Sequence, residues 1–111
     1  MNYLLGLEIP PTAVFAYNDI MAIGALRAAH EHRLRVPNDF SIIGFDDITE
    51  APFTCPALTT IRQAKFEMGR HGMELLLHLI SGGSVGTIEK VPPLEVELII
   101  RESTGIVAAD R

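Results

Sequence analysis

A strand–helix–strand pattern over residues 13–46 constrains the fold of this chain more than any other feature. "AVFAY" (13–17) is a short apolar run after two prolines, which predicts a strand buried on both faces. Asn18 then offers a helix cap, a helix is expected over 20–32, and "FSIIGFD" (40–46) predicts a second strand. Such a unit has parallel strands and a right-handed crossover, so the sequence predicts an α/β fold.

The first predicted helix is unusually apolar. Its polar residues form one narrow stripe, made of Arg27, His30 and Glu31. Apolar residues occupy most of the remaining circumference: Ile20, Met21, Ala22, Ile23, Ala25, Leu26, Ala28 and Ala29. We expect a helix of this kind to be covered on two sides. One side packs on the sheet, and a subunit interface is a candidate for the other.

The rest of the chain supplies too few strands for a complete doubly wound sheet. "LTTIRQ" (58–63) predicts an extended segment, and "LEVELII" (94–100) alternates in part, as a strand does. Between them, apolar residues at helical spacing from Phe66 predict a helix that ends at Gly82-Gly83. A doubly wound sheet usually has about five or six strands with helices on both faces. We therefore expect a partial doubly wound parallel sheet that belongs to a larger domain.

Charge and composition exclude several function classes. A chain of 111 residues suits one small domain, and a formal charge of −5 argues against this chain itself coating nucleic acid. The single cysteine, Cys55, cannot form an internal disulfide and favours a reducing compartment. No stretch approaches the roughly 20 apolar residues of a membrane span, and the first residues make a poor signal peptide. A cytoplasmic location without membrane contact is expected.

Asn18 and Asp46 are the candidate ligand-binding residues. Each lies just past the carboxyl end of a predicted parallel strand, where open α/β sheets bind their ligands. A carboxylate accepts hydrogen bonds and an amide both donates and accepts them, which suits the hydroxyls of a sugar or similar polyol. On spacing alone, a plainer alternative is favoured, in which Asn18 only caps its helix and Asp46 only opens a loop.

The adjacent carboxylates Asp46 and Asp47 also suggest a receiver-like phosphoacceptor that holds Mg²⁺. Adjacent residues of a strand point to opposite faces, which argues against convergence of the pair, and Asp47 is then expected only to start the loop. That chemistry also needs a hydroxyl and a lysine, for which the candidates are Thr59, Thr60 and Lys65.

A metal site and an enzyme active site are both disfavoured. His71, Glu74 and His78 share one predicted helix face, but an i, i+4 histidine pair is absent and a plain polar surface is the favoured interpretation. The sequence contains no G-x-S-x-G, G-x-G-x-x-G or P-loop motif, and no nucleophile beside a base. We expect no catalysis, no metal and no cofactor.

The quoted blocks also carry a family resemblance. "PTAVFAYNDIMAIGALRAAHEHRLRVPNDFSIIGFDDI", "PALTTIRQ", "EMGRHGMELLLHLISG" and "ELIIRESTG" resemble, in order and at similar spacing, the C-terminal third of LacI/GalR-type transcriptional repressors. The resemblance covers nearly all of the chain. It implies a periplasmic-binding-protein-like effector domain, in which two α/β lobes close on a small molecule, often a sugar or nucleobase. It also implies three segments: 1–58 in the C-terminal lobe, 59–93 as crossover and N-terminal-lobe helix, and 94–111 as return strand and tail.

The resemblance assigns roles to particular residues. Asn18 and Asp46 match positions that contact the effector in the family. The helix after "ND" helps to form the family's dimer interface, which agrees with the wide apolar surface inferred above. The matching interface positions are Ile23, Leu26 and Arg27, with Thr54 from the loop.

Departures from the family pattern limit what this chain alone does. No helix-turn-helix DNA reader is present in it, so operator DNA is expected to be bound only through parts outside this chain. Arg33 stands where the family usually has glycine after the helix, and Tyr17 replaces a small residue before "ND", where it could narrow the pocket or stack on a ring. We expect the effector-sensing and dimerisation portion of a LacI-type regulator. A sugar-binding transport component of the same fold is the main alternative.

Overall fold

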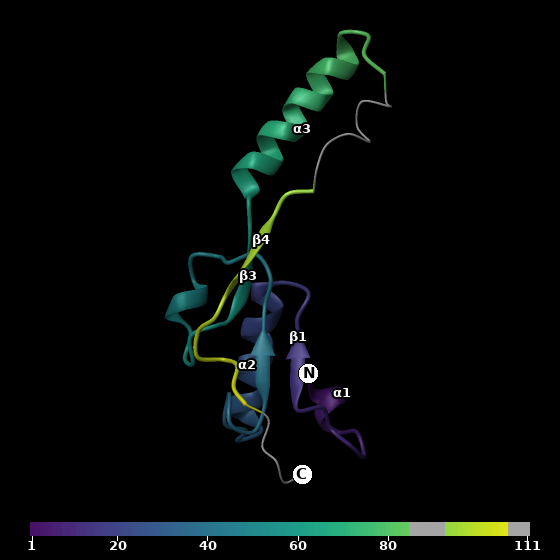
Figure 1. Ribbon diagram of the computed structural model, residues 1–111. Coiled ribbons are helices and arrows are strands. Elements are labelled where there is room, and N and C mark those ends of the chain that lie inside the picture. Colours follow the sequence, from purple (N-terminus) through teal and green to yellow (C-terminus); the bar gives the residue numbers. More distant parts are fainter. Residues whose placement is uncertain (85–92, 107–111) are drawn as a thin grey trace. The chain divides into compact units, whose positions relative to one another are not determined.

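The computed structural model describes residues 1–84 and 93–106 (Figure 1). Its elements are, in order, α1 (Asn2–Leu5), β1 (Ala13–Phe15), α2 (Asp19–Glu31), β2 (Ser41–Ile43), the 3₁₀ helix η1 (Ala51–Phe53), β3 (Thr60–Gln63), α3 (Lys65–Ile80) and β4 (Val96–Ile99). The chain divides into two compact units: a first unit of residues 1–62 with the chain from Glu97 on, and a second unit of residues 63–96. Residues 85–92 of the predicted segment 59–93, and 107–111 of the predicted tail, lie outside the described residues.

The predicted βαβ unit is confirmed, with shorter strands than expected. β1 and β2 pair in parallel, with Val14 opposite Ile42. Hydrogen bonds continue beyond the strands, because Ala16 N donates to Ile43 O at 2.8 Å and Asp19 N donates to Phe45 O at 2.8 Å. The two chain segments therefore stay side by side as far as Asn18 and Asp46.

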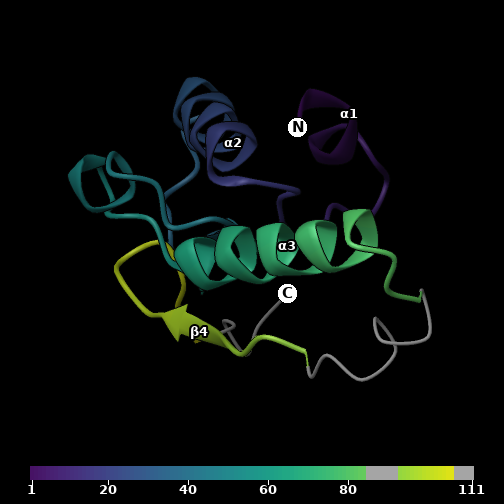
Figure 2. The same cartoon turned by 90° about the horizontal axis from the view of Figure 1, so that it is seen from above.

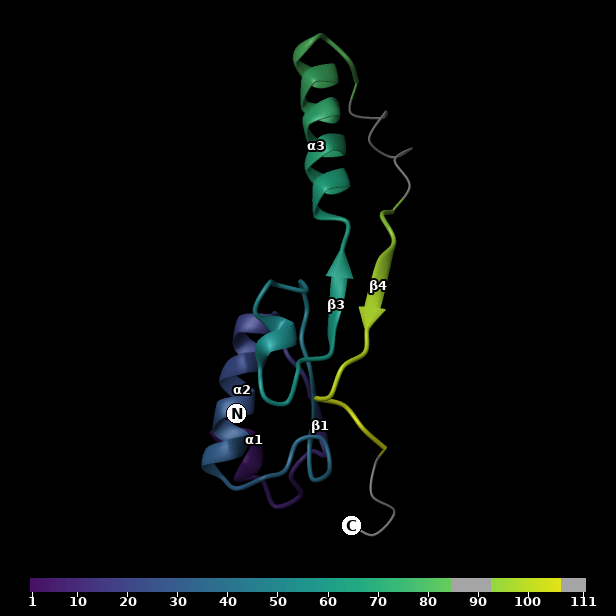
Figure 3. The ribbon, with the colours of Figure 1, turned by 90° about the vertical axis from the view of Figure 1, so that its left-hand side faces the viewer.

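The far edge of β2 binds two segments from much later in the chain. Ile43 forms a parallel bridge with Thr59, and Gly44 N donates to Thr59 O at 2.9 Å. The segment after β4 joins the same edge, since Ile42 N donates to Ser103 O at 2.8 Å. β3 and β4 pair with each other, and Figure 3 shows their arrows running in opposite directions. β1 and β2 thus form one two-stranded sheet and β3 and β4 another, and the bridge at Thr59 links the segment before β3 to the edge of β2.

One side of α2 packs on the sheet, as predicted. Its buried residues are mostly alanines, which let the helix approach β2 closely, and Figure 3 shows α2 lying along one side of β1 and β2. The buried apolar core consists of Ala16, Ala22, Ala25, Leu26, Ala29, Phe40, Ile42, Ala51 and Leu58. The second apolar side stays largely open in the described chain, where Ile20 and Met21 are 65% and 58% exposed. The short helix α1, which the sequence did not predict, lies beside α2 (Figure 2).

Local chemistry explains where α2 begins and where α2 and α3 end. Asn18 has an extended backbone and caps α2. After α2, Arg33 adopts a φ of 60°, the left-handed conformation for which glycine is better suited. α3 ends before Gly82, whose φ is 87°, as the predicted glycine stop requires.

The second unit is built around α3, and none of that helix's residues is buried. Its predicted apolar stripe is present and exposed: Phe66 81%, Met73 56%, Leu76 51%, Leu77 55% and Ile80 73%. Arg70 pairs with Glu67 at 2.6 Å and with Glu74 at 2.7 Å on the helix surface. Such i, i+3 and i, i+4 pairs stabilise a helix only modestly.

Candidate functional site

Asn18 is a helix cap in the structure. Its Oδ1 accepts a hydrogen bond from Met21 N at 2.8 Å, and the residue is half-buried. The predicted helix cap at Asn18 is thereby confirmed. Within the described part of the chain, the amide Nδ2 donates no hydrogen bond, so its two hydrogens remain able to bind a ligand.

Asp46 lies beside Asn18 at the carboxyl end of the parallel pair. Asp19 N donates a hydrogen bond to Phe45 O. Asn18 directly precedes Asp19 and Asp46 directly follows Phe45, so both candidate residues lie next to this bonded pair. Asp46 is half-buried and has a φ of 115°, which residues with a Cβ rarely adopt. Its own N donates to Ile61 O at 2.9 Å. The predicted juxtaposition of Asn18 and Asp46 therefore follows from the backbone pairing.

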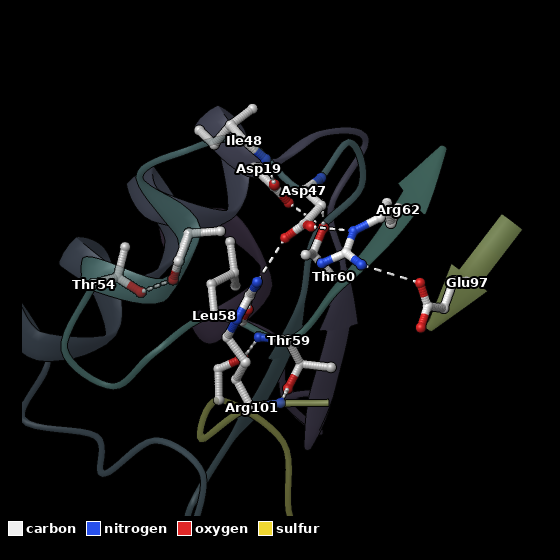
Figure 4. Close-up of polar contacts among 12 residues, drawn as sticks. Asp19, Asp47, Ile48, Thr54, Leu58, Thr59, Thr60, Arg62, Glu97 and Arg101 are labelled. Carbon is white, nitrogen blue, oxygen red and sulfur yellow. Dashed lines mark hydrogen bonds and ion pairs between the residues drawn. The ribbon is translucent and has the colours of Figure 1, made fainter. Parts of the chain in front are cut away.

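Asp19 is a structural residue that the sequence did not reveal. Its side chain is fully buried, and its carboxylate accepts hydrogen bonds from Thr60 Oγ1 at 2.5 Å and from Ile48 N at 2.9 Å (Figure 4). A Cβ at Gly44 would clash with Asp19 Oδ1, so only glycine fits there without a shift. Asp19 thus fastens the start of α2 to β3 and to the loop after β2.

Asp47 does more than start a loop, which corrects the expectation from the sequence. Its carboxylate binds two guanidinium groups, Arg62 Nε at 2.7 Å and Arg101 Nη2 at 2.7 Å (Figure 4). Arg101 also donates to Leu58 O at 2.8 Å, and Arg62 to Glu97 at 3.1 Å. The alternation of side chains along a strand does not explain why Asp46 and Asp47 have different contacts. β2 ends at Ile43, and both residues have positive φ.

The charge of Asp47 is stabilised by these partners. Partial burial raises the pKa of the Asp47 carboxyl, but the hydrogen bonds and charges of Arg101 and Arg62 outweigh it, so the pKa lies below its ordinary value of 3.8. Asp47 is therefore ionised and engaged at neutral pH. The two candidate hydroxyls of a receiver-like site are both engaged, Thr60 with Asp19 and Thr59 with Thr104. The geometry of these residues thus argues against the phosphoacceptor alternative.

The predicted polar face of α3 shows ordinary surface contacts. Arg70 Nη2 lies 2.8 Å from His71 Nε2, and the same arginine pairs with Glu74. Among residues 1–84 and 93–106, no group of three or more His, Cys, Asp or Glu side chains is placed to hold a metal ion. Cys55 is an exposed free thiol.

The four predicted interface residues differ in exposure. Arg27 has 82% of its side chain exposed and pairs with Glu31 at 3.0 Å. Ile23 is half-buried against the core, and Leu26, at 8% exposure, belongs to the core itself. The half-buried Thr54 donates its hydroxyl to Ala51 O and Pro56 O. Their role in a dimer remains a prediction, with Leu26 suited to support that surface from beneath.

A groove of about 620 Å³ runs between α1, β1 and α2. Its lining includes Tyr3, Phe15 and Tyr17 together with Met21 and Ala28. Tyr17 is 83% exposed, lines this groove and directly precedes Asn18 in the sequence. Whether it stacks on a ligand stays a prediction.

The comparison with known families decides the classification. Residues 3–104 match the periplasmic binding protein-like domain. The chain belongs to this family. Its curated relatives are LacI-family repressors, which confirms the predicted resemblance. The HTH-type transcriptional repressor CytR of Escherichia coli K12 is 50% identical over 104 residues, which are 94% of this chain and 30% of that repressor. The HTH-type transcriptional repressor PurR of Haemophilus influenzae PittEE is 47% identical over 105 residues, 93% of this chain and 31% of the repressor. The chain thus spans about a third of the length of these relatives.

Solved structures agree on the fold. A LacI family transcriptional regulator from Bifidobacterium animalis subsp. lactis superposes with a TM-score of 0.83 at 36% identity, covering 96% of this chain and 38% of the regulator. The Lac repressor dimer bound to operator and the anti-inducer ONPF gives 0.72 at 38% identity, covering 88% and 32%. The predicted periplasmic-binding-protein-like α/β fold is therefore confirmed. Within the described residues, no helix is long and apolar enough to cross a membrane.

Proposed function

We propose that this chain is the effector-sensing and dimerisation portion of a cytoplasmic LacI-type transcriptional regulator. A small effector, a sugar or similar polyol, binds at Asn18 and Asp46 and alters the operator affinity of the full-length protein. The observation that carries this proposal is the hydrogen bond from Asp19 N to Phe45 O at 2.8 Å. It keeps the backbone of Asn18 and Asp46 side by side at the carboxyl ends of parallel strands, where α/β sheets bind ligands.

The two side chains offer complementary chemistry to a hydroxylated ligand. The Asp46 carboxylate accepts hydrogen bonds from hydroxyl groups, while Asn18 donates through Nδ2 because its Oδ1 is engaged in the helix cap. Both residues stand on backbone that is hydrogen-bonded on each side, so little ordering is required on binding. This arrangement recognises a molecule without making or breaking bonds, and the chain uses no cofactor.

Dimerisation would connect the site to DNA. The surface of α2 that carries Ile23 and Arg27, with Thr54 nearby in the loop, is the proposed contact between two copies. Effector binding changes the closure of the lobes, and the dimer passes that change to DNA-reading heads outside this chain. The solved neighbours include a Lac repressor dimer bound to operator, which supports this scheme by analogy.

A sugar-binding transport component is the competing function, because the family description applies to it as well. The regulator is favoured because the curated relatives at 50% and 47% identity are transcriptional repressors. A transport component would bind sugar and show no affinity for DNA.

Operator binding by the full-length protein separates the two functions. Fluorescence anisotropy is measured with labelled DNA from upstream of the protein's own gene, with and without cellobiose, ribose, adenosine or hypoxanthine. The regulator function predicts specific binding and a shift of at least about tenfold in affinity with one of these compounds, a coupling of about 1.4 kcal/mol. Sugar binding without any specific DNA binding would overturn it in favour of transport.

A further inference from the structure

The backbone at the end of β2 adopts a conformation that its residues do not favour. Asp46 has a φ of 115° and Asp47 a φ of 49°. Positive φ is uncommon for residues with a Cβ, and values beyond the left-handed helical region suit glycine above all. Such conformations persist only where surrounding contacts hold them, and they gather at functional sites.

Three successive backbone amides of this turn donate hydrogen bonds to other segments of the chain. Asp46 N donates to Ile61 O at 2.9 Å, Asp47 N to Thr60 Oγ1 at 3.4 Å, and Ile48 N to Asp19 Oδ2 at 2.9 Å. All three acceptors lie far along the chain from the turn. The backbone is therefore fixed from β3 and from the start of α2, not by the turn sequence itself.

The side chain of Asp47 adds a second set of restraints. Arg62 comes from β3 and Arg101 from the segment after β4, and each contacts a different oxygen of the carboxylate at 2.7 Å (Figure 4). Asp47 and Arg101 have only 10% and 16% of their side chains exposed. We call this arrangement of Asp47, Arg62 and Arg101 the Asp47 clamp.

We propose that the Asp47 clamp is a positioning device for effector binding: it holds the neighbouring Asp46 in its disfavoured backbone conformation and thereby fixes the carboxylate that binds the effector. The inference rests on the proposed function of Asp46. A glycine at position 46 would suit the backbone better, so the aspartate is kept there at a cost in stability. Asp47, Arg62 and Arg101 act through Asp46 and need not touch the effector.

The two arginines do not contribute equally. Arg101 is largely buried, and besides Asp47 it holds Leu58 O through Nη1. Arg62 is 50% exposed and shares its guanidinium with Glu97. Solvent screens an exposed pair more strongly, so Arg101→Met should weaken positioning more than Arg62→Met.

The first test needs no effector and uses the melting temperature of the full-length protein. Asp46→Gly removes the backbone strain and should raise Tm by about 2 °C or more. Asp47→Asn weakens the side-chain restraints and leaves the three backbone hydrogen bonds in place, so in that background the turn relaxes in part and the same substitution should gain less than about half of that. An equal gain in both backgrounds would show that the clamp does not impose the conformation and would overturn the inference.

The second test measures binding by calorimetry, with the tightest binder among cellobiose, ribose, adenosine and hypoxanthine. Asp47→Asn should weaken binding about tenfold in the wild-type background, comparable to losing part of a charged hydrogen bond. In the Asp46→Asn background it should change binding less than about twofold, because Asp47 acts through Asp46. Asp47→Glu, which keeps the charge, should recover part of the affinity.

A matched control breaks another carboxylate–arginine pair of the same unit. Asp39 accepts from Arg35 Nη2 at 2.6 Å, and Asp39→Asn should leave binding unchanged. If Asp46→Asn weakens binding and Asp47→Asn does not, the clamp inference fails while the proposed site stands. If Asp46→Asn binds as tightly as the wild type, the proposed site itself fails.

Discussion

The two units of this chain are stabilised in different ways. In the first unit, side-chain contacts join residues far apart in sequence, such as Asp19 with Thr60 and Asp47 with Arg101, around a buried apolar core. The ion pairs of α3 in the second unit lie within one helical turn, and none of that helix's residues is buried. Tertiary contacts therefore stabilise the first unit. α3 depends on helix propensity and on ion pairs within the helix, which leave an isolated helix only marginally stable.

This contrast has a consequence for function. The candidate site lies wholly in the first unit, on backbone that long-range contacts fix. α3 presents an exposed apolar stripe, which is expected to be covered by a partner surface in the working protein. The backbone of the candidate site is therefore fixed by contacts within the first unit, whereas the apolar stripe of α3 is exposed.

The largest expected effect is on the free energy of unfolding, when one large apolar side chain in each unit is truncated to alanine. Ile42→Ala removes a fully buried side chain and should destabilise the chain by about 3–4 kcal/mol in urea unfolding. Leu76→Ala removes a side chain that is 51% exposed and should cost less than about 0.5 kcal/mol. Similar losses for both variants would show that α3 is packed as tightly as the core and would remove the contrast.

The next largest loss of stability is expected from removal of the buried Asp19 carboxylate. Asp19→Ala leaves Thr60 Oγ1 and Ile48 N without their acceptor and should cost about 3 kcal/mol. Gly44→Ala is expected to be damaging in the wild type, where its Cβ meets Asp19, and much less so in the Asp19→Ala background. Additive unfolding free energies for the two substitutions would show that they do not contact each other.

The ion pairs of Asp47 should appear as a pH dependence of stability. The pKa of Asp47 is lower in the folded chain than the ordinary 3.8, so its contribution is present above that value and is lost as the pH falls through the folded pKa. We expect about 1 kcal/mol, allowing for solvent screening at Arg62. Urea unfolding of the wild type should lose this amount relative to Asp47→Asn between pH 5 and the acid limit. Parallel curves for the two proteins would argue against the ion pairs.

The smallest expected effect is a gain in stability. Arg33 follows α2 with a φ of 60°, and Arg33→Gly should stabilise the chain by about 0.5 kcal/mol because glycine adopts this conformation without strain. Thermal unfolding with Arg33→Ala as the control, which removes the same side chain but keeps a Cβ, measures the difference. A loss of stability for Arg33→Gly would mean that the arginine makes compensating contacts.

Local patterns in the sequence predicted the main strands and helices, but not α1, η1 or the contacts between elements. Apolar runs and a cap at Asn18 predicted the parallel βαβ unit, and a glycine stop predicted the end of α3. The side-chain partners of Asp19 and Asp47 lie 15 to 54 residues away in the sequence, so no local spacing rule could reveal them. Asp47 was consequently expected to do nothing beyond starting a loop.

The candidate site was predicted for a physical reason that the structure supports. Parallel pairing forces the carboxyl ends of two strands together, so Asn18 and Asp46 had to lie near each other once the βαβ unit was correct. The backbone strain at Asp46 was beyond prediction, because it depends on hydrogen bonds to Ile61 and on the neighbouring clamp.

Calorimetric titration of the full-length protein tests the central claim most directly. Asp46→Ala and Asn18→Ser are compared with the wild type against cellobiose, ribose, adenosine and hypoxanthine; serine keeps an oxygen to cap α2 and removes only the amide. If Asn18 and Asp46 form the effector site, both variants bind the best compound at least about tenfold more weakly than the wild type, a loss of about 1.4 kcal/mol. Wild-type affinity in both variants would contradict the account.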